Sequence, residues 1–231
     1  VDRILEGRYR FLDSKIIQDK RTKQWLLSLA YGFEPNLNHC LDPEKVTGVD
    51  LGLNIPACLA LNRGPVRRSV GDRDHIIKFR TQIKNRRSKM AQNMMSNGRN
   101  RQNVLKAVNR LADKEKRWVA DYNHKMSKKI VEFALKNSSG TIQLEALTKD
   151  VKKTKFLAEN WAYDQLQRMI KYKAQGIGIR VNFIDPAYTS QKCSKCGYIS
   201  KENRERKTVE FNCKSPSCGF SANADYNAAV N

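Results

Sequence analysis

Four cysteines near the carboxyl end place the tightest constraint on what this 231-residue chain can fold into. They form two pairs, Cys193 with Cys196 and Cys213 with Cys218, and the sixteen residues between the pairs have the length of a hairpin. Four thiolates can surround one Zn²⁺ ion at about 2.3 Å, and a shell closed by four cysteines is structural rather than catalytic. The pattern predicts a zinc ribbon and disfavours two disulfides, idle thiols or a redox centre.

The charge of the chain predicts a polyanionic partner. Lys and Arg number 44 against 23 Asp and Glu, which gives a net charge of +21. Between residues 67 and 129 there are nineteen basic and five acidic residues, so 14 of the 21 net charges lie in this segment. Nucleic acid is the partner that such a one-signed field favours.

Most of this basic segment lies within a stretch that is predicted to be mainly helical, residues 72–137. Apolar residues recur there at steps of three and four, which gives one apolar stripe and leaves the remaining surface to Lys and Arg. We expect the stripe to pack on a sheet and the basic face to contact phosphates. The stripe consists of Val104, Val108, Leu111, Trp118, Tyr122, Met126, Ile130 and Phe133.

The order of the other predicted elements indicates an α/β fold. Strands are expected at 9–11, 14–18 and 24–31, as the tail of a β domain, and then at 46–52, 55–61 and 66–70 as an antiparallel meander. A strand at 141–145, a helix at 158–175 and a strand at 179–184 follow, and a last helix covers 222–230. The Asn- and Arg-rich stretch 97–103 is expected to be a loop.

Neither a membrane span nor a signal peptide is evident in the sequence. No run approaches the roughly 20 apolar residues that cross a bilayer. A soluble intracellular protein is the expectation. Because the chain lacks an initiator Met and stops inside a predicted helix, we also expect it to be part of a longer polypeptide.

Three acids stand out by their position in the predicted elements. Asp50 lies within an apolar strand, Glu145 ends another strand, and Asp225 lies in the first turn of the last helix. Each also has an ordinary structural interpretation, as a turn, a cap or a first-turn helix acid. Asp185, before Pro186, is either a fourth acid of the same site or a turn cap.

The aromatic and histidine residues give weaker signals. Trp161 and Tyr163 are able to stack on a nucleic-acid base, although core packing of their helix is the favoured interpretation. His39, His75 and His124 lack metal-ligand spacing and are predicted to be surface residues.

Four segments resemble, in this order, the RuvC-like nuclease core of transposon TnpB proteins and of the miniature type V-F CRISPR effectors. They are 48–52 (GVDLG), 142–147 (IQLEAL), 189–197 (TSQKCSKCG) and 223–229 (NADYNAA). The resemblance spans 46–231, and the opening strands look like the end of the wedge domain of the miniature effectors. One departure is the four-residue spacing between Cys213 and Cys218, where members of the family often have two; we still expect the ribbon to close.

The resemblance implies a domain plan and a catalytic site. The end of a wedge domain would occupy 1–45, an RNase H-like (RuvC-like) mixed sheet with flanking helices 46–190, a zinc-ribbon insertion 191–220, and a final RuvC-like segment 221–231. Asp50, Glu145 and Asp225 would hold two catalytic Mg²⁺ ions, one activating the attacking water and one stabilising the leaving 3′ oxygen. One Zn²⁺ would be held by Cys193, Cys196, Cys213 and Cys218.

The implied function is the nuclease half of an RNA-guided DNA endonuclease of antiviral defence. Its partners would be a guide RNA and a target DNA whose strands are cut singly, in a homodimer that shares one guide RNA in the cytoplasm of a prokaryotic cell. Two alternatives remain: a monomeric TnpB-type transposon nuclease, and a zinc-ribbon nucleic-acid regulator that has lost cleavage. Retention of all three acids argues against the regulator.

Overall fold

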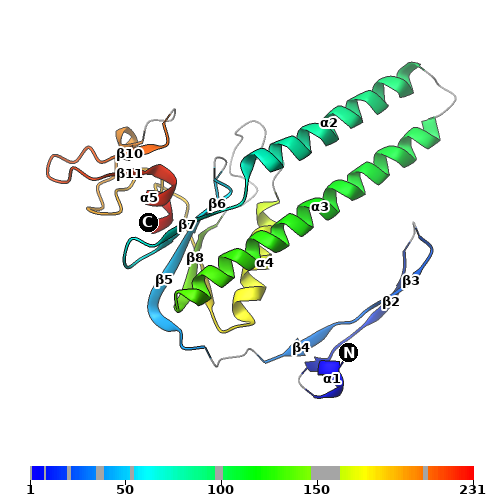
Figure 1. Ribbon diagram of the computed structural model, residues 1–231, viewed down its shortest axis with the longest axis horizontal. Helices are drawn as coiled ribbons and strands as arrows, with labels where there is room; N and C mark the ends of the chain where they lie inside the picture. Colours follow the sequence, from blue (N-terminus) through cyan, green and yellow to red (C-terminus); the bar gives the residue numbers. More distant parts are fainter. Residues whose placement is uncertain are drawn as a thin grey trace.

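A five-stranded mixed sheet forms the centre of the protein (Figure 1). This computed structural model describes residues 2–7, 9–19, 22–34, 39–52, 55–96, 101–146, 162–204 and 208–231. The sheet has the order β7-β6-β5-β8-β9. Strands β5 to β7 form an antiparallel meander, and β8 and β9 run parallel to β5. The strands are β5 (Asp42–Asp50), β6 (Ala57–Leu61), β7 (Arg67–Val70), β8 (Ser139–Glu145) and β9 (Arg180–Ile184).

Helices cover both faces of this sheet. On one face, α3 (Arg101–Lys136) and α4 (Tyr163–Gln175) pack against the strands and form the main core. Its most deeply buried side chains include Leu59, Ile130, Ile142, Leu144, Leu166 and Ile170. On the other face, the short helix α5 (Ala224–Val230) packs against β5 and β6. The predicted mixed α/β architecture is therefore confirmed.

Alternation along β6 assigns its side chains to the two faces. Leu59 belongs to the α3–α4 core, whereas Cys58 and Ala60 pack with Ala229 of α5. Successive residues of a strand point to opposite faces, and cross-strand partners share a face. Because Gly48 pairs with Ala60, it too lies beneath α5.

Gly48 lets α5 approach the sheet closely. A Cβ atom added there would lie 1.8 Å from the carbonyl oxygen of Ala229. We expect Gly48→Ala to lower the free energy of unfolding of the full-length protein by about 3 kcal/mol, because the helix backbone must move. The matched change Gly32→Ala, whose Cβ would be 3.6 Å from the nearest atom, should be tolerated. Denaturant unfolding of both variants checks this; equal stabilities would contradict the packing described.

The basic segment forms a long helical hairpin of α2 (Arg73–Ser96) and α3 (Figure 1). Phe79 stacks on Trp118 with 4.0 Å between ring centroids, and Glu115 forms ion pairs with Arg80 and Arg87 across the two helices. The helical segment predicted at 72–137 is confirmed over 73–96 and 101–136. Of the loop predicted at 97–103, residues 101–103 belong to α3, and residues 97–100 lie outside the described residues. Among the described residues, no helix has the length and apolar character of a membrane span.

The N-terminal segment forms two small antiparallel pairs rather than part of the main sheet. After α1 (Asp2–Leu5), β1 (Tyr9–Phe11) pairs with β4 (Tyr31–Phe33), and β2 (Lys15–Gln18) pairs with β3 (Trp25–Ser28). The single strand predicted at 24–31 was wrong, because the backbone leaves the first ladder after Ser28 and joins a different one at Tyr31.

The segment that carries the four cysteines, residues 191–223 and here called the cysteine segment, lies on the α5 side of the molecule (Figure 1). It contains a 3₁₀ turn (Lys201–Asn203) and the hairpin of β10 (Glu210–Asn212) with β11 (Ser221–Asn223), which leads into α5. The helix predicted at 222–230 therefore begins two residues later, because residues 222 and 223 pair with β10 and Asn223 caps the helix. Helix α4 confirms 163–175 of the helix predicted at 158–175; residues 158–161, Trp161 among them, lie outside the described residues.

Candidate active site and metal centre

Two of the predicted acids end neighbouring parallel strands. Asp50 is the last residue of β5, not a mid-strand residue as predicted, and Glu145 is the last residue of β8. Val49 pairs with Leu144 one position earlier, so the two acids are adjacent across the ladder. Asp50 also pairs with Cys58, which places it on the α5 face of the sheet.

Asp225 reaches the same region from the first turn of α5. Its side chain is buried, and the Asn223 side chain caps the helix by accepting the backbone N–H groups of Asp225 and Tyr226 at 3.0 and 3.2 Å. An Asn cap accepts N–H groups that have no partner within the helix and so fixes where the helix begins. The three acids thus come from two strand ends and one capped helix start.

The pKa of Asp50 reflects the nearby charges of the other two acids. Burial, and then the charges of Glu145 and Asp225, raises the pKa of Asp50 to about 7, and the Arg204 cation opposes them. Burial also raises the pKa of Glu145, although the Thr189 hydroxyl and Arg204 act in the opposite direction. Carboxylates that disfavour one another's ionised form are stabilised by a cation placed between them.

Arg204 and Thr189 complete the surroundings of the acids. An Arg204 guanidinium nitrogen lies 3.2 Å from Asp225 Oδ1. The Thr189 hydroxyl donates to the Glu145 carboxylate and also contacts the Pro186 carbonyl oxygen at 3.1 Å. The sequence gives no signal for this pairing, because residue spacing does not reveal a contact between positions 21 residues apart.

The donor set suits a hard divalent cation. Three carboxylates offer oxygen ligands of the kind that Mg²⁺ prefers, and at neighbouring positions they need positive charge nearby. In the described part of the chain, the four cysteines are the group of three or more His, Cys, Asp or Glu side chains placed to hold a metal ion together. The acids are therefore neighbours that do not form a closed ligand shell.

The remaining candidates take structural roles. Asp185 Oδ1 accepts the N–H of Ala187 at 2.9 Å, which is the turn-capping alternative. Tyr163 packs against the main core, and its hydroxyl donates to the Gly52 carbonyl oxygen at 3.4 Å. Burial, followed by the charge of Asp50, raises the pKa of Tyr163 to about 12. His75 and His124 are exposed, as predicted, whereas His39 is half-buried.

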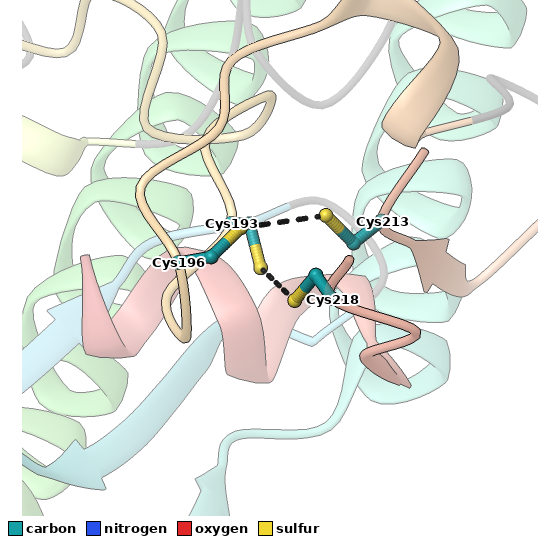
Figure 2. A group of neighbouring side chains, drawn as sticks. All are labelled: Cys193, Cys196, Cys213 and Cys218. Atoms are coloured by element: carbon teal, nitrogen blue, oxygen red, sulfur yellow. Dashed lines mark hydrogen bonds between the residues drawn. The ribbon is translucent and has the colours of Figure 1, made fainter. Parts of the chain in front are cut away.

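The four cysteines converge on one point (Figure 2). Their sulfur atoms all lie within 4.8 Å of one another, with Cys193 Sγ 3.9 Å from Cys218 Sγ and Cys196 Sγ 3.6 Å from Cys213 Sγ. Tetrahedral Zn²⁺ with Zn–S bonds of about 2.3 Å requires sulfur atoms roughly 3.8 Å apart. The thiols are not joined by disulfides, and their geometry fits such an ion. The wider second pair closes the cluster as predicted.

The turns around the cysteines explain how the cluster forms. Gly197 and Gly219 directly follow a cysteine and have φ of +77° and +56°, a backbone region that glycine adopts without strain. A backbone hydrogen bond from Tyr198 lowers the pKa of Cys196 to about 7, which favours the thiolate that binds metal.

Buried asparagines join the cysteine segment to α5. The Asn227 side chain donates to the Lys192 carbonyl oxygen at 2.7 Å and accepts the Ser194 N–H at 2.9 Å, so it clamps the first cysteine turn. Asn203, also buried, donates to the carbonyl oxygens of Gln191 and Tyr198 and accepts the Lys214 N–H, which ties the two halves of the segment together. The cluster therefore supports the helix that carries Asp225.

Comparison with known proteins agrees with the predicted resemblance. Residues 163–231 match the family model "Cas12f1-like, TNB domain". The chain is 40% identical over 238 residues to a CRISPR-associated endodeoxyribonuclease Cas12f1 of Sulfoacidibacillus thermotolerans, with all of this chain and 55% of that protein covered. It is 40% identical over 214 residues to Cas12f1 of Syntrophomonas palmitatica, covering 88% of this chain and 42% of that protein. The chain thus spans about half the length of these relatives.

Solved structures and a more distant relative extend the comparison. A cryo-EM structure of a Cas12f1–sgRNA–target DNA complex superposes with a TM-score of 0.79 at 26% identity, over 99% of this chain and 46% of that one. A TnpB-like protein of Methanocaldococcus jannaschii is 32% identical over 112 residues, 46% of this chain and 40% of that protein. The resemblance is confirmed: the whole chain is similar to Cas12f1, a miniature type V-F CRISPR effector related to TnpB proteins, and residues 163–231 match its TNB domain.

Proposed function

We propose that this chain is the nuclease half of an RNA-guided DNA endonuclease, which hydrolyses phosphodiester bonds in DNA strands exposed by guide RNA pairing. The observation that carries the proposal is that Asp50 and Glu145 end adjacent strands, and that Asp225 lies near enough for its charge to raise the pKa of Asp50. Similarity to Cas12f1 endodeoxyribonucleases over the whole chain supports it. The strand order, three antiparallel strands followed by two parallel ones, is consistent with an RNase H-like sheet.

The acids would hold two Mg²⁺ ions, which when bound supply an activated water and charge stabilisation of the leaving 3′ oxygen. The chain itself sets the direction in which those acids point. Thr189 orients the Glu145 carboxylate, the Gln167 side chain donates to the Glu145 carbonyl oxygen at 2.7 Å, and Arg204 restrains Asp225. These contacts hold the carboxylates in place before the DNA strand arrives, which lowers the reorganisation required for the reaction.

The proposed partners are a guide RNA and a target DNA. The helical hairpin α2–α3 provides most of the excess positive charge that phosphate backbones would contact. We propose a structural Zn²⁺ at the four cysteines, the end of a wedge domain at 1–45, and a homodimer on one guide RNA, as the resemblance to the miniature effectors implies.

A TnpB-type nuclease is the second candidate function. It rests on the similarity to TnpB-like proteins, which extends over less of the chain than the similarity to Cas12f1. The chemistry would be the same and the assembly different. Light-scattering mass of the full-length protein with its guide RNA separates the two: two protein chains per guide favour the effector, and one chain favours the transposon nuclease.

The raised pKa of Asp50 predicts how pH changes the requirement for Mg²⁺. The protonated carboxyl must lose its proton before it binds the ion, and in the metal-free protein it holds that proton up to pH of about 7. The Mg²⁺ concentration for half-maximal cleavage should therefore rise as pH falls below 7, by up to ~10-fold per pH unit, and level off above 7. Titrating Mg²⁺ at pH 6, 7 and 8 measures this; a flat response from 6 to 8 would contradict the assignment.

The proposal is tested by giving the full-length protein its guide RNA and labelled double-stranded DNA, with and without Mg²⁺. Guided binding is measured on the same samples. Mg²⁺-dependent cutting of guide-matched DNA supports the proposal. Guided binding without any cutting would instead assign the chain to the class of non-cleaving nucleic-acid regulators.

A further inference from the structure

An arginine on the edge strand of the sheet lies on the same face as the acids. Arg67 is the first residue of β7, where it is exposed and pairs with Ala60. Ala60 packs with α5, so Arg67 shares the α5 face. The next residue, Arg68, pairs with Leu59 of the main core and therefore points to the opposite face. The adjacent residues Arg67 and Arg68 therefore point to opposite faces of the sheet.

The Arg67 side chain is held next to the residue that follows Asp225. Its guanidinium carbon lies 5.3 Å from the centroid of the Tyr226 ring, within the range of a cation–π contact. Tyr226 is half-buried and packs against the Cys58–Ala60–Ala229 cluster beneath α5. Among the described residues, Arg67 forms no ion pair, whereas Arg204 is engaged by Asp225.

The positive charge of Arg67 affects the pKa of Cys58, a neighbour of the acids. Cys58 lies opposite Asp50 in the β5–β6 ladder. Burial and the charges of Asp50 and Asp225 raise the pKa of this thiol to about 12, and Arg67 is the cation that acts against them. A guanidinium held against Tyr226, and without an ion pair to any described carboxylate, therefore lies on the β7 side of the three acids.

We propose that Arg67, oriented by Tyr226, binds a phosphate of the DNA strand being cut and positions that strand over Asp50, Glu145 and Asp225. The inference rests on the proposed nuclease function. Three carboxylates repel a polyanionic strand, so the approach of that strand requires a cation beside them. Guanidinium binds phosphate through paired hydrogen bonds and presents a fixed fork once its plane is stacked on an aromatic ring. Arg67 is a positioning residue, and the acids remain the catalytic ones.

The first test compares Arg67→Gln with Arg68→Gln, which removes the same charge from the same strand on the other face. Both are made in the full-length protein and assembled with guide RNA and target DNA. Loss of one charge-assisted phosphate contact should slow single-turnover cleavage by roughly 10-fold in Arg67→Gln. Arg68→Gln should cut within about twofold of the wild type. Guided binding should be unchanged in both variants.

A charge-neutral substrate distinguishes a phosphate contact from a purely structural role. Methylphosphonate replaces each phosphate in turn within a few nucleotides of the cut. At one position the substitution should slow the wild type and Arg68→Gln by about 10-fold and leave Arg67→Gln no slower than it already is, since the two changes remove the same contact. Tyr226→Leu, which removes the ring face that orients Arg67, should lose part of the cleavage rate.

Three outcomes overturn the inference in distinguishable ways. A wild-type complex that binds guided DNA without cutting it overturns the proposed function, and this inference with it. A cutting wild type, with Arg67→Gln and Arg68→Gln equally active, overturns the inference alone. So does a slow Arg67→Gln that remains sensitive to methylphosphonate at every position, because its defect would then be structural.

Discussion

Replacing Asp50, Glu145 or Asp225, one at a time, by the amide of the same size is expected to slow guided DNA cleavage by roughly 10³-fold or more. Each amide keeps the shape of the side chain and removes one anionic oxygen ligand from the shared face of β5, β8 and α5. The measurement is single-turnover cleavage in Mg²⁺ by the full-length protein with its guide RNA. Guided DNA binding should persist, since the acids contribute negative charge that opposes binding.

Asp185→Asn provides the matched control for these variants. Asp185 also follows the end of a sheet strand, but its carboxylate caps a turn by accepting the Ala187 N–H. An asparagine at this position preserves that cap, so cleavage should stay within about threefold of the wild type. If Asp185→Asn were as inactive as Asp50→Asn, the active site would include a fourth acid and the assignment of three would be wrong.

Loss of the Zn²⁺ that we propose at the cysteine cluster is expected to reduce cleavage indirectly, through α5. Cys213→Ser leaves three sulfur ligands where four converge, and a zinc chelator withdraws the ion itself. Structural zinc sites supply much of the folding energy of small ribbons. If the first cysteine turn unfolds, Asn227 loses its hydrogen bonds to the Lys192 carbonyl oxygen and the Ser194 N–H, which hold α5 in place. Asp225, which lies on α5, then loses its position. Cleavage should fall by roughly 10²-fold or more.

Measuring zinc content and cleavage in the same variants checks this coupling. Zinc content by elemental analysis should be close to one per chain in the wild type and should fall in Cys213→Ser together with cleavage. Cys40→Ser, at an exposed cysteine outside the cluster, should alter neither. A Cys213→Ser protein that has lost its zinc and still cuts at the wild-type rate would show that the ribbon does not support Asp225.

The site could be predicted from the sequence where local pattern and chemistry coincide. The cysteine pairs carry turn glycines and ligand spacing, so the cluster was predictable even with the wider Cys213–Cys218 spacing. Asp50 and Glu145 stand out in the sequence because each is an acid in a predicted strand, although Asp50 was expected within its strand rather than at its end. That they share a site with Asp225 was expected only from the resemblance, because helical or strand period does not encode which distant elements meet.

Contacts that depend on tertiary packing were out of reach of sequence reasoning. The pairing of Arg204 with Asp225 depends on how the cysteine ribbon folds against α5, which the sequence does not encode locally. Nothing in the sequence around Gly48 indicates that the backbone of α5 packs directly against this residue. Residues 24–31 are likewise divided between β3 and β4 because these strands pair with different partners, β2 and β1, which local sequence does not specify.

The central claim is that Asp50, Glu145 and Asp225 form one divalent-cation site, and direct counting of bound metal tests it most directly. Mn²⁺ binds the same oxygen ligands as Mg²⁺ and is counted by electron paramagnetic resonance as it is titrated into the full-length protein with guide RNA and DNA. The account predicts that the wild type and Asp185→Asn bind two more Mn²⁺ ions per active chain than Asp50→Asn or Asp225→Asn. Equal Mn²⁺ binding by all four proteins would contradict it.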